Sequence, residues 1–173
     1  MGAGYWPLGR RPEGSGHRPT GVADGQRAED EMAQMPVLDV VAVTIAAPDP
    51  RELAAFYERM LGWTIVASEP ARPGFPPQDG WAQLRPPEGR GGPTLNFEYE
   101  EHYAAPTWPS APGQQHITAH LDIAVADLDE SVAWALATGA TLAEYQPQDL
   151  VRVLLDPAGH PFCLFLSAAP AGS

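Results

Sequence analysis

The sequence predicts an α+β fold made of two copies of a βαβββ unit. Apolar and β-branched segments occur in the order strand, helix, strand, strand, strand, and this order returns after a proline-rich stretch. The start signals of the two helices, Asp49 and Asp127, are 78 positions apart, and their stop signals, Gly62 and Gly139, are 77 apart. Matching signals at nearly one offset indicate an internal repeat, so we expect two modules that pack together.

The repeat sets the expected domain boundaries. Residues 1–35 are rich in glycine, proline and charge without an apolar period, which is typical of a disordered leader. We therefore expect one domain over 36–168, after the leader and before a disordered tail at 169–173. Within this domain we expect module one at 36–101, a linker at 102–115 and module two at 116–168.

Module one begins with a strand over 37–45, whose apolar and β-branched residues predict burial on both faces. A helix follows, because Asp49 and Glu52 form a capping box and Gly62 suits a left-handed helix stop. Pro50 fits the first helical position. Three strands complete the module, at 63–68, 80–85 and 94–100.

Module two repeats this order with more polar residues on its first strand, which we expect over 117–125. Alternation along this segment places His116, Thr118, His120 and Asp122 on one face. A capped helix follows, and three short strands complete the module, at 141–145, 150–155 and 162–166.

Composition narrows the classes of partner and chemistry. The formal net charge of −12 argues against nucleic acid or an anionic membrane surface, because phosphates bind basic patches. All ten basic residues are arginine, so Schiff-base chemistry by lysine is excluded. The single cysteine excludes an intrachain disulfide. We expect a cytoplasmic homodimer with a small-molecule ligand, and Trp134, off the apolar stripe of its helix, as a subunit contact.

Three stretches together resemble a known superfamily. They are PDPRELAAFYERMLGW in module one, with HLDIAVADLDESVAWALATGA and RVLLDPAGHPFCLFL in module two. In their order and repetition they are similar to the vicinal oxygen chelate superfamily, the glyoxalase, bleomycin-resistance and extradiol-dioxygenase group. The resemblance implies a mixed sheet that curls around a concave cleft, where that family binds metal or ligand.

The resemblance also implies positions for metal ligands. A ligand on the first strand of each module would precede the capping aspartate by seven residues, which gives Ala42 and His120. Ligands on the last strands would be Glu98 and Cys163. Alanine cannot bind a metal, and Cys163 stands in an apolar context. The cofactor is therefore either none or a divalent ion, Zn, Ni, Mn or Fe, held by His120, Glu98 and possibly Cys163.

Further residues are candidates for the cleft. Asp122 has the spacing to orient the imidazole of His120, so the two form a candidate catalytic pair, although both could simply face water. The candidate ligand-binding residues are Glu98, Asn96, Arg152, Trp81 and Trp108, with Tyr103 as a further aromatic wall. We expect His160, within AGHPF, to be a turn residue without a catalytic role.

Three classes of function remain open from the sequence. The first is a binding protein that lacks a complete metal-ligand set, with a bleomycin-type antibiotic-binding resistance protein as one form of it. The second is a metal-dependent lyase, isomerase or dioxygenase that uses His120 and Glu98. The third is metal-free catalysis with His120 as a general base.

Overall fold

The computed structural model describes residue 36 and residues 38–167 of the chain. The expected leader at 1–35 and tail at 169–173 lie outside the described residues. Contacts between residues separate a unit that begins at Val40 from the chain before it. Among the described residues, no helix has both the length and the apolar character needed to cross a membrane.

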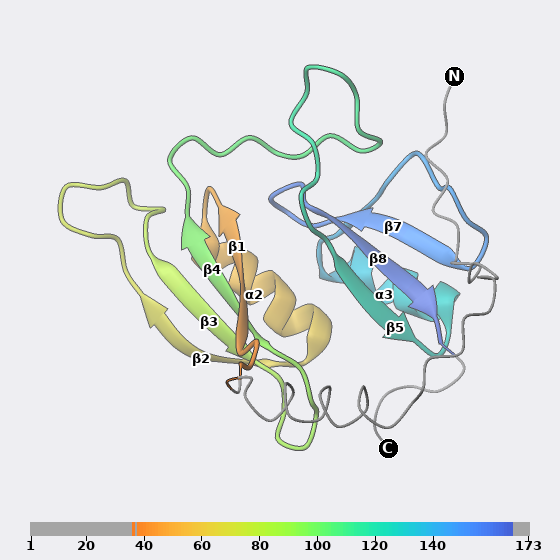
Figure 1. The fold of residues 1–173 in the computed structure, drawn as a ribbon, viewed down its shortest axis with the longest axis horizontal. Coiled ribbons are helices and arrows are strands. Elements are labelled where there is room, and N and C mark those ends of the chain that lie inside the picture. Colours follow the sequence, from red (N-terminus) through yellow and green to blue (C-terminus); the bar gives the residue numbers. More distant parts are fainter. Residues whose placement is uncertain (1–35, 37, 168–173) are drawn as a thin grey trace, which may run out of the picture. The chain divides into compact units, whose positions relative to one another are not determined.

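Module one forms a four-stranded mixed sheet. Its strands are β1 (Ala42–Ala47), β2 (Thr64–Glu69), β3 (Trp81–Arg85) and β4 (Thr94–Tyr99). They lie in the order β1-β4-β3-β2, with β1 parallel to β4 and the other pairs antiparallel (Figure 1). The last strand in the sequence thus lies beside the first, which leaves β1 as an edge strand.

Module two forms a second sheet with the same topology. Its strands are β5 (Leu121–Val125), β6 (Thr141–Leu142), β7 (Val151–Leu155) and β8 (Pro161–Leu166). The order is β5-β8-β7-β6, and β5 is parallel to β8 (Figure 1). The predicted α+β fold of two βαβββ modules is confirmed.

The two helices begin and end at the predicted signals. Helix α2 (Pro50–Leu61) starts after Asp49, whose side chain accepts the backbone N–H of Glu52 at 3.0 Å. Helix α3 (Leu128–Thr138) is capped in the same way by Asp127. Gly62 follows α2 with a φ of +65°, in the left-handed region that costs glycine little.

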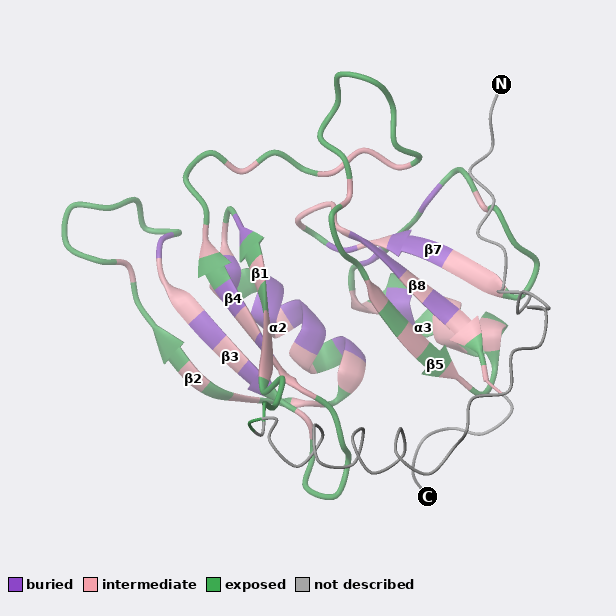
Figure 2. Ribbon diagram, viewed as in Figure 1, coloured by how far each residue is buried: buried purple, intermediate pink, exposed green. Residues whose placement is uncertain are grey.

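Helix α2 supplies the centre of the core. Its buried residues are Pro50, Leu53, Ala54, Phe56, Tyr57 and Met60. The Tyr57 ring stacks on Phe97 of β4 at 5.6 Å between centroids and meets Phe162 of β8 edge-on at 6.3 Å. Figure 2 shows buried residues along α2 and along β3, β4, β7 and β8. One helix therefore packs against both modules, and burying its aromatic rings joins them.

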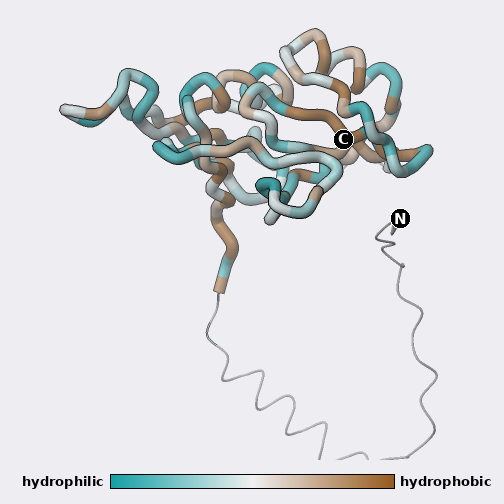
Figure 3. The backbone as a smooth tube through the Cα atoms, turned by 90° about the horizontal axis from the view of Figure 1, so that it is seen from above, coloured by the Kyte–Doolittle hydropathy of each residue, from teal (hydrophilic) through white to brown (hydrophobic). Residues whose placement is uncertain are grey.

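Three predicted strands are shorter by three or more residues in the structure. The first begins at Ala42 and not at residue 37, because its partner strand β4 begins opposite it at Thr94. Val40 and Val41 before it are 81% and 72% exposed, and this mostly hydrophobic approach to β1 is visible in Figure 3. The strand predicted over 141–145 is reduced to two residues.

The third shortened strand changes where the histidines lie. The strand predicted over 117–125 begins at Leu121, where β5 pairs with Phe162 of β8. His116, Thr118 and His120 therefore lie in the connection before the strand and not on one strand face. Because strands persist only where a neighbour pairs with them, polar alternation alone overstated the length of this one.

Candidate ligand-binding site

A cavity of about 390 Å³ lies between the two modules. Its walls are the edge strand β1, parts of the connection between β4 and β5, and His160 with Pro161 from module two. We call it the inter-module cavity. Its volume falls within the range of about 300–1,000 Å³ that is usual for small-molecule sites.

The inter-module cavity gathers the histidines. His102, His116, His120 and His160 all line it, and they are the four histidines within the described residues. The first three stand in the irregular connection between β4 and β5, and the fourth in the turn between β7 and β8. Glu100 lines the same cavity. The site therefore combines several titratable side chains that can change charge near neutral pH.

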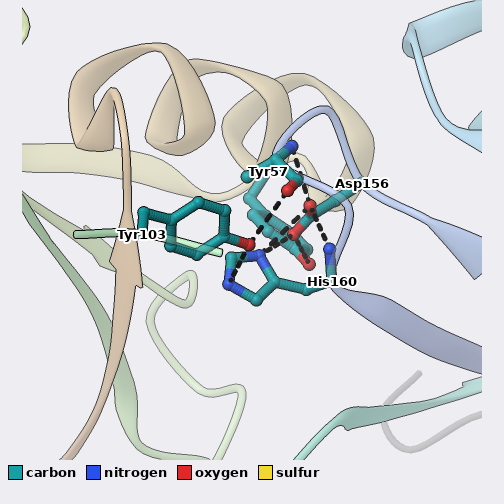
Figure 4. A network of polar contacts seen from close by, with 5 residues as sticks. Tyr57, Tyr103, Asp156 and His160 are labelled. Carbon is teal, nitrogen blue, oxygen red and sulfur yellow. Dashed lines mark hydrogen bonds and ion pairs between the residues drawn. The ribbon is translucent and has the colours of Figure 1, made fainter. Parts of the chain in front are cut away.

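A buried polar network forms one wall of this cavity (Figure 4). Asp156, which is 4% exposed, accepts hydrogen bonds from the Tyr57 hydroxyl at 3.0 Å and from the backbone N–H groups of Ala158 and His160 at 2.9 Å each. The Nδ1 atom of His160 lies 3.0 Å from the same carboxylate. Four donors thus satisfy a carboxylate that would otherwise be costly to bury.

The outer half of the network is Tyr103, whose hydroxyl lies 3.0 Å from Nε2 of His160 and donates to the carbonyl of Ala158 at 2.9 Å. Burial, first, and the charge of Asp156, second, raise the pKa values of Tyr57 and Tyr103, so both remain neutral phenols. His160 is a turn residue, as expected. Its turn also joins module two to α2 and to the connection between β4 and β5. The DPAGHP pattern identified the turn, but no pattern in the sequence linked it to Tyr57 or Tyr103.

A second polar cluster lies on module two. The register of β5 and β8 pairs Asp122 with Cys163, and Nε2 of His120 lies 3.2 Å from Oδ1 of Asp122. One ligand atom from each of the three residues lies within 4.8 Å of the others. Burial and the neighbouring Asp122 carboxylate raise the pKa of Cys163 to about 11, so the thiol is protonated at neutral pH.

The strand register identifies the equivalent positions in module one. Asp122 stands five residues before the capping Asp127 and pairs with Cys163, whereas Thr44 stands five residues before the capping Asp49 and pairs with Asn96. Asn96 is therefore the counterpart of Cys163. Glu98, the residue selected from the sequence, lies two positions further and pairs with Ala46.

The other predicted residues of module one lie together, away from the inter-module cavity. Trp81 pairs with Glu98, and the Gln83 side-chain amide donates to the Asn96 side chain at 2.9 Å. These residues alternate with buried Ala82, Leu84, Leu95 and Phe97, so they occupy the face of the sheet opposite α2. Of the predicted candidates within the described residues, only His120 and Tyr103 line the inter-module cavity.

Arg152 and Trp108 lie elsewhere than the sequence suggested. Arg152 pairs with Leu164, which places it on the sheet face opposite Asp122 and Cys163, and its guanidinium donates to the carbonyl of Asp149 at 2.9 Å. The indole of Trp108 donates to the carbonyl of Tyr145 at 2.9 Å and packs on that ring.

A second cavity, of about 580 Å³, also lies between β1 and β5 and is mostly apolar. Leu61, Trp63 and Ile123 line it, together with Asp122 and Arg90. Among the described residues that line it there is no histidine. The inter-module cavity is the stronger candidate because it combines apolar walls with several groups that can orient a ligand.

Comparison with known proteins identifies the fold family. A family model described as a glyoxalase-like domain matches residues 42–165, which is most of the chain. The chain belongs to this family. No curated protein sequence matches this glyoxalase-like domain significantly.

Solved structures share the fold of this glyoxalase-like domain. A glyoxalase/bleomycin resistance protein/dioxygenase family enzyme from Burkholderia phytofirmans is 21% identical, with 75% of this chain and 98% of that chain covered and a TM-score of 0.51. A glyoxalase family protein from Enterococcus faecalis is 23% identical, with 73% and 96% covered and a TM-score of 0.51. The fosfomycin resistance protein FosX from Listeria monocytogenes is 14% identical, with 80% and 93% covered and a TM-score of 0.52.

The donors in this glyoxalase-like domain do not fit the divalent-metal site that the resemblance implies. The four equivalent positions are Ala42, Asn96, His120 and Cys163. Alanine offers no donor and an amide oxygen is a weak one, so module one supplies no strong ligand to such a site. We therefore derive no reaction step through a metal shared by the two modules.

Proposed function

We propose that this glyoxalase-like domain binds a small organic molecule in the inter-module cavity and does so without a metal. The observation that carries the proposal is the cavity itself, whose lining comes from both modules and includes four histidines together with several apolar residues. Concave sites with an apolar lining and a few convergent polar groups are the usual form of small-molecule sites.

The fold is compatible with such binding. The FosX structure, which has this fold, is a complex with Mn(II) and the small phosphonate 1S,2S-dihydroxypropylphosphonic acid. This complex supports only the point that a protein with this fold can hold a small molecule. The incomplete donor set, Ala42 and Asn96 in module one, supports binding without the metal.

Thermal unfolding with a ligand panel tests this proposal. The panel contains neutral, cationic and anionic aromatic compounds and glycopeptide antibiotics, and it is run with and without EDTA. We expect at least one compound to raise the Tm equally in both conditions, because a ligand that binds only the folded state stabilises it. A panel that leaves the Tm unchanged, or a shift that EDTA abolishes, would contradict metal-independent binding.

The cluster of His120, Asp122 and Cys163 favours a second candidate function, a metal-dependent lyase, isomerase or dioxygenase. Imidazole, carboxylate and thiolate donors within 4.8 Å of one another suit a zinc-type site with an open position. A bound ion would supply Lewis-acid chemistry there. Because ion and proton compete for the thiolate of Cys163, the affinity should rise with pH.

Cobalt absorption separates this candidate from the first. Co(II) bound by Cys163 should give a sulfur-to-cobalt charge-transfer band, which Cys163→Ser and His120→Gln should remove. Glu98→Gln is the matched control, since that carboxylate is outside the cluster. A stoichiometric band that survives Cys163→Ser, or the absence of any band, would reject the site.

Metal-free catalysis stays a proposal as well. The 3.2 Å contact of His120 with Asp122 would orient the imidazole as a general base. Loss of turnover in His120→Ala with an unchanged Tm supports it, and full turnover in that variant rejects it.

A cytoplasmic homodimer also stays a proposal. Trp134, the expected subunit contact, is 54% exposed, and its indole donates to the carbonyl of Met60 within the chain. Sedimentation of the wild type and of Trp134→Ala tests the dimer. A wild-type monomer at all concentrations would contradict it.

A further inference from the structure

We propose that the inter-module cavity selects a small organic anion, with an apolar body and one acidic head group such as a carboxylate or a phosphonate. This inference rests on the proposed function and adds the class of ligand. It starts from one observation: four imidazoles, all the histidines within the described part of the chain, converge on a single cavity.

Two of these imidazoles are available to a ligand. The rings of His102 and His116 form no hydrogen bond or ion pair with any residue that the structure describes, although both line the cavity. Thr44 and Thr118 line it too. A protonated imidazole offers two N–H donors and a positive charge, so an acidic head group can both accept hydrogen bonds and pair with the charge.

The neighbouring carboxylates and phenols already have hydrogen-bond or ion-pair partners. The carboxylate of Asp156 is satisfied by the network described above, and the hydroxyls of Tyr57 and Tyr103 are used within it. Asp122 contacts His120 at 3.2 Å. Asp156 and Asp122 are not among the residues that line the cavity, and neither carboxylate contacts His102 or His116.

Glu100 is the group that opposes an anion. It lines the cavity, and its carboxylate accepts the backbone N–H of His102 at 2.9 Å. This one exposed carboxylate stands against the two imidazoles of His102 and His116, each of which can carry a positive charge. The net charge of −12 acts over longer distances, where salt screens it beyond about 8 Å at physiological ionic strength.

The rest of the lining suits an apolar body. Aliphatic and proline side chains from both modules face the cavity: Val43, Ile45, Pro106, Ala119, Leu121 and Pro161. Burying the hydrocarbon part of a ligand against them removes apolar surface from water, which favours binding. The acidic head would supply orientation and the apolar body much of the affinity.

Calorimetric titration with three matched probes tests this inference. The probes are 2-naphthoate, 2-naphthalenemethanol and 2-naphthylmethylammonium, which share one apolar body and differ in charge. At about pH 6, below the usual imidazole pKa of about 6.5, we expect 2-naphthoate to bind at least about tenfold more tightly than the ammonium probe. At about pH 8 we expect this preference to shrink, because histidine side chains in general carry less positive charge as pH rises.

Variants test whether His102 and His116 cause the preference for 2-naphthoate. The double variant His102→Gln/His116→Gln should bind 2-naphthoate about tenfold more weakly at about pH 6 and should lose most of the pH dependence. Glu144→Gln, an exposed carboxylate change outside the cavity, is the matched control and should bind as the wild type does. Circular dichroism of each variant checks the fold.

The outcomes separate this inference from the proposed function. Equal or tighter binding of the alcohol or the ammonium probe overturns anion selection but leaves small-molecule binding intact. Binding of 2-naphthoate that the double variant retains, or no binding of any of the three probes, also overturns it. The ligand panel with EDTA then decides the proposed function separately.

Discussion

The two modules share one topology but divide their roles. Module one supplies the helix that fills the core, since six residues of α2 are buried, whereas Ala135 is the one buried residue described on α3. Module two supplies the polar chemistry. At three equivalent positions it has His120, Asp122 and Cys163 where module one has Ala42, Thr44 and Asn96. The duplicated backbone thus keeps the same caps and strand order while its side chains specialise.

This difference shows what holds a duplicated fold together. The capping aspartates and terminal glycines recur in both modules because each helix needs them to start and stop. Donor residues on the strands are under no such structural requirement. Module one is therefore the packing module, and module two is the module that holds the polar donors.

The packing contrast predicts unequal costs for truncating the two helices. Phe56→Ala in α2 should lower the free energy of unfolding by about 3–5 kcal/mol, because it leaves a cavity beside Tyr57 and Phe162. Leu136→Ala in α3, where the side chain is 42% exposed, should cost less than about 1 kcal/mol. Urea unfolding of both variants measures this, and equal costs would break the comparison.

The buried network should contribute almost as much as the aromatic core. Asp156→Ala should lower the free energy of unfolding by about 3 kcal/mol, because it leaves His160 and the Tyr57 hydroxyl without their acceptor. Tyr57→Phe keeps the ring contacts and removes one hydrogen bond, so it should cost about 1.5 kcal/mol. Urea unfolding compares the two. An Asp156→Ala variant as stable as the wild type would show that the network does not join the modules.

The polar cluster of module two predicts a change in cysteine reactivity. The carboxylate of Asp122 helps to raise the pKa of Cys163 to about 11, so Asp122→Asn should lower that pKa and increase the thiolate fraction. Alkylation by iodoacetamide at about pH 8 should therefore become several-fold faster, by about tenfold for each unit that the pKa falls. Glu98→Gln is the matched control in module one. A rate that Asp122→Asn leaves unchanged would contradict the contact.

The smallest predicted effect concerns pH and an ion pair in module one. Hydrogen bonds from the Arg72 guanidinium, which approaches to 2.7 Å, lower the pKa of Asp79 to about 2 from its ordinary 3.8. A depressed carboxyl pKa stabilises the fold above the unfolded value, and this contribution is lost as pH falls through about 2. The Tm of Arg72→Gln should therefore lie below that of the wild type at about pH 5.

The same ion pair should contribute less to stability at low pH. The Tm difference between Arg72→Gln and the wild type should narrow as pH falls from about 4 to about 2, because the wild type loses the contribution of the ionised Asp79 carboxylate as pH approaches its pKa of about 2. A scanning calorimetry series over this range checks it. A difference that widens toward low pH would contradict the contact.

Much of the fold could be predicted from the sequence because its signals are local. Asp49, Gly62, Asp127 and Gly139 act within one helical turn, so the sequence alone located both helices and their repeat. Strand ends were less accurate, since Ala42 and Leu121 begin their strands where a distant partner begins. Pairing across the sheet is not visible in a single stretch of sequence.

The candidate site was predicted less completely for the same reason. Spacing from the capping aspartate selected His120, and alternation selected Asp122, which the structure does bring within 3.2 Å of each other. The choice of Glu98 in place of Asn96 depended on the register of β1 and β4, which the sequence does not specify. The contacts of Tyr57 and Tyr103 with the turn at Asp156 and His160 join residues more than 50 positions apart.

The most direct test asks where a ligand enters the molecule. Imidazole and indole resonances can be followed by NMR while 2-naphthoate and 2-naphthalenemethanol are titrated into the wild-type protein, with substitutions at His116 and Trp81 for assignment. Binding in the inter-module cavity predicts that the resonances of His102 and His116 shift with saturation while the indole of Trp81 does not. A saturating shift of Trp81 with unchanged imidazoles would place the ligand on the open sheet face of module one and contradict the account.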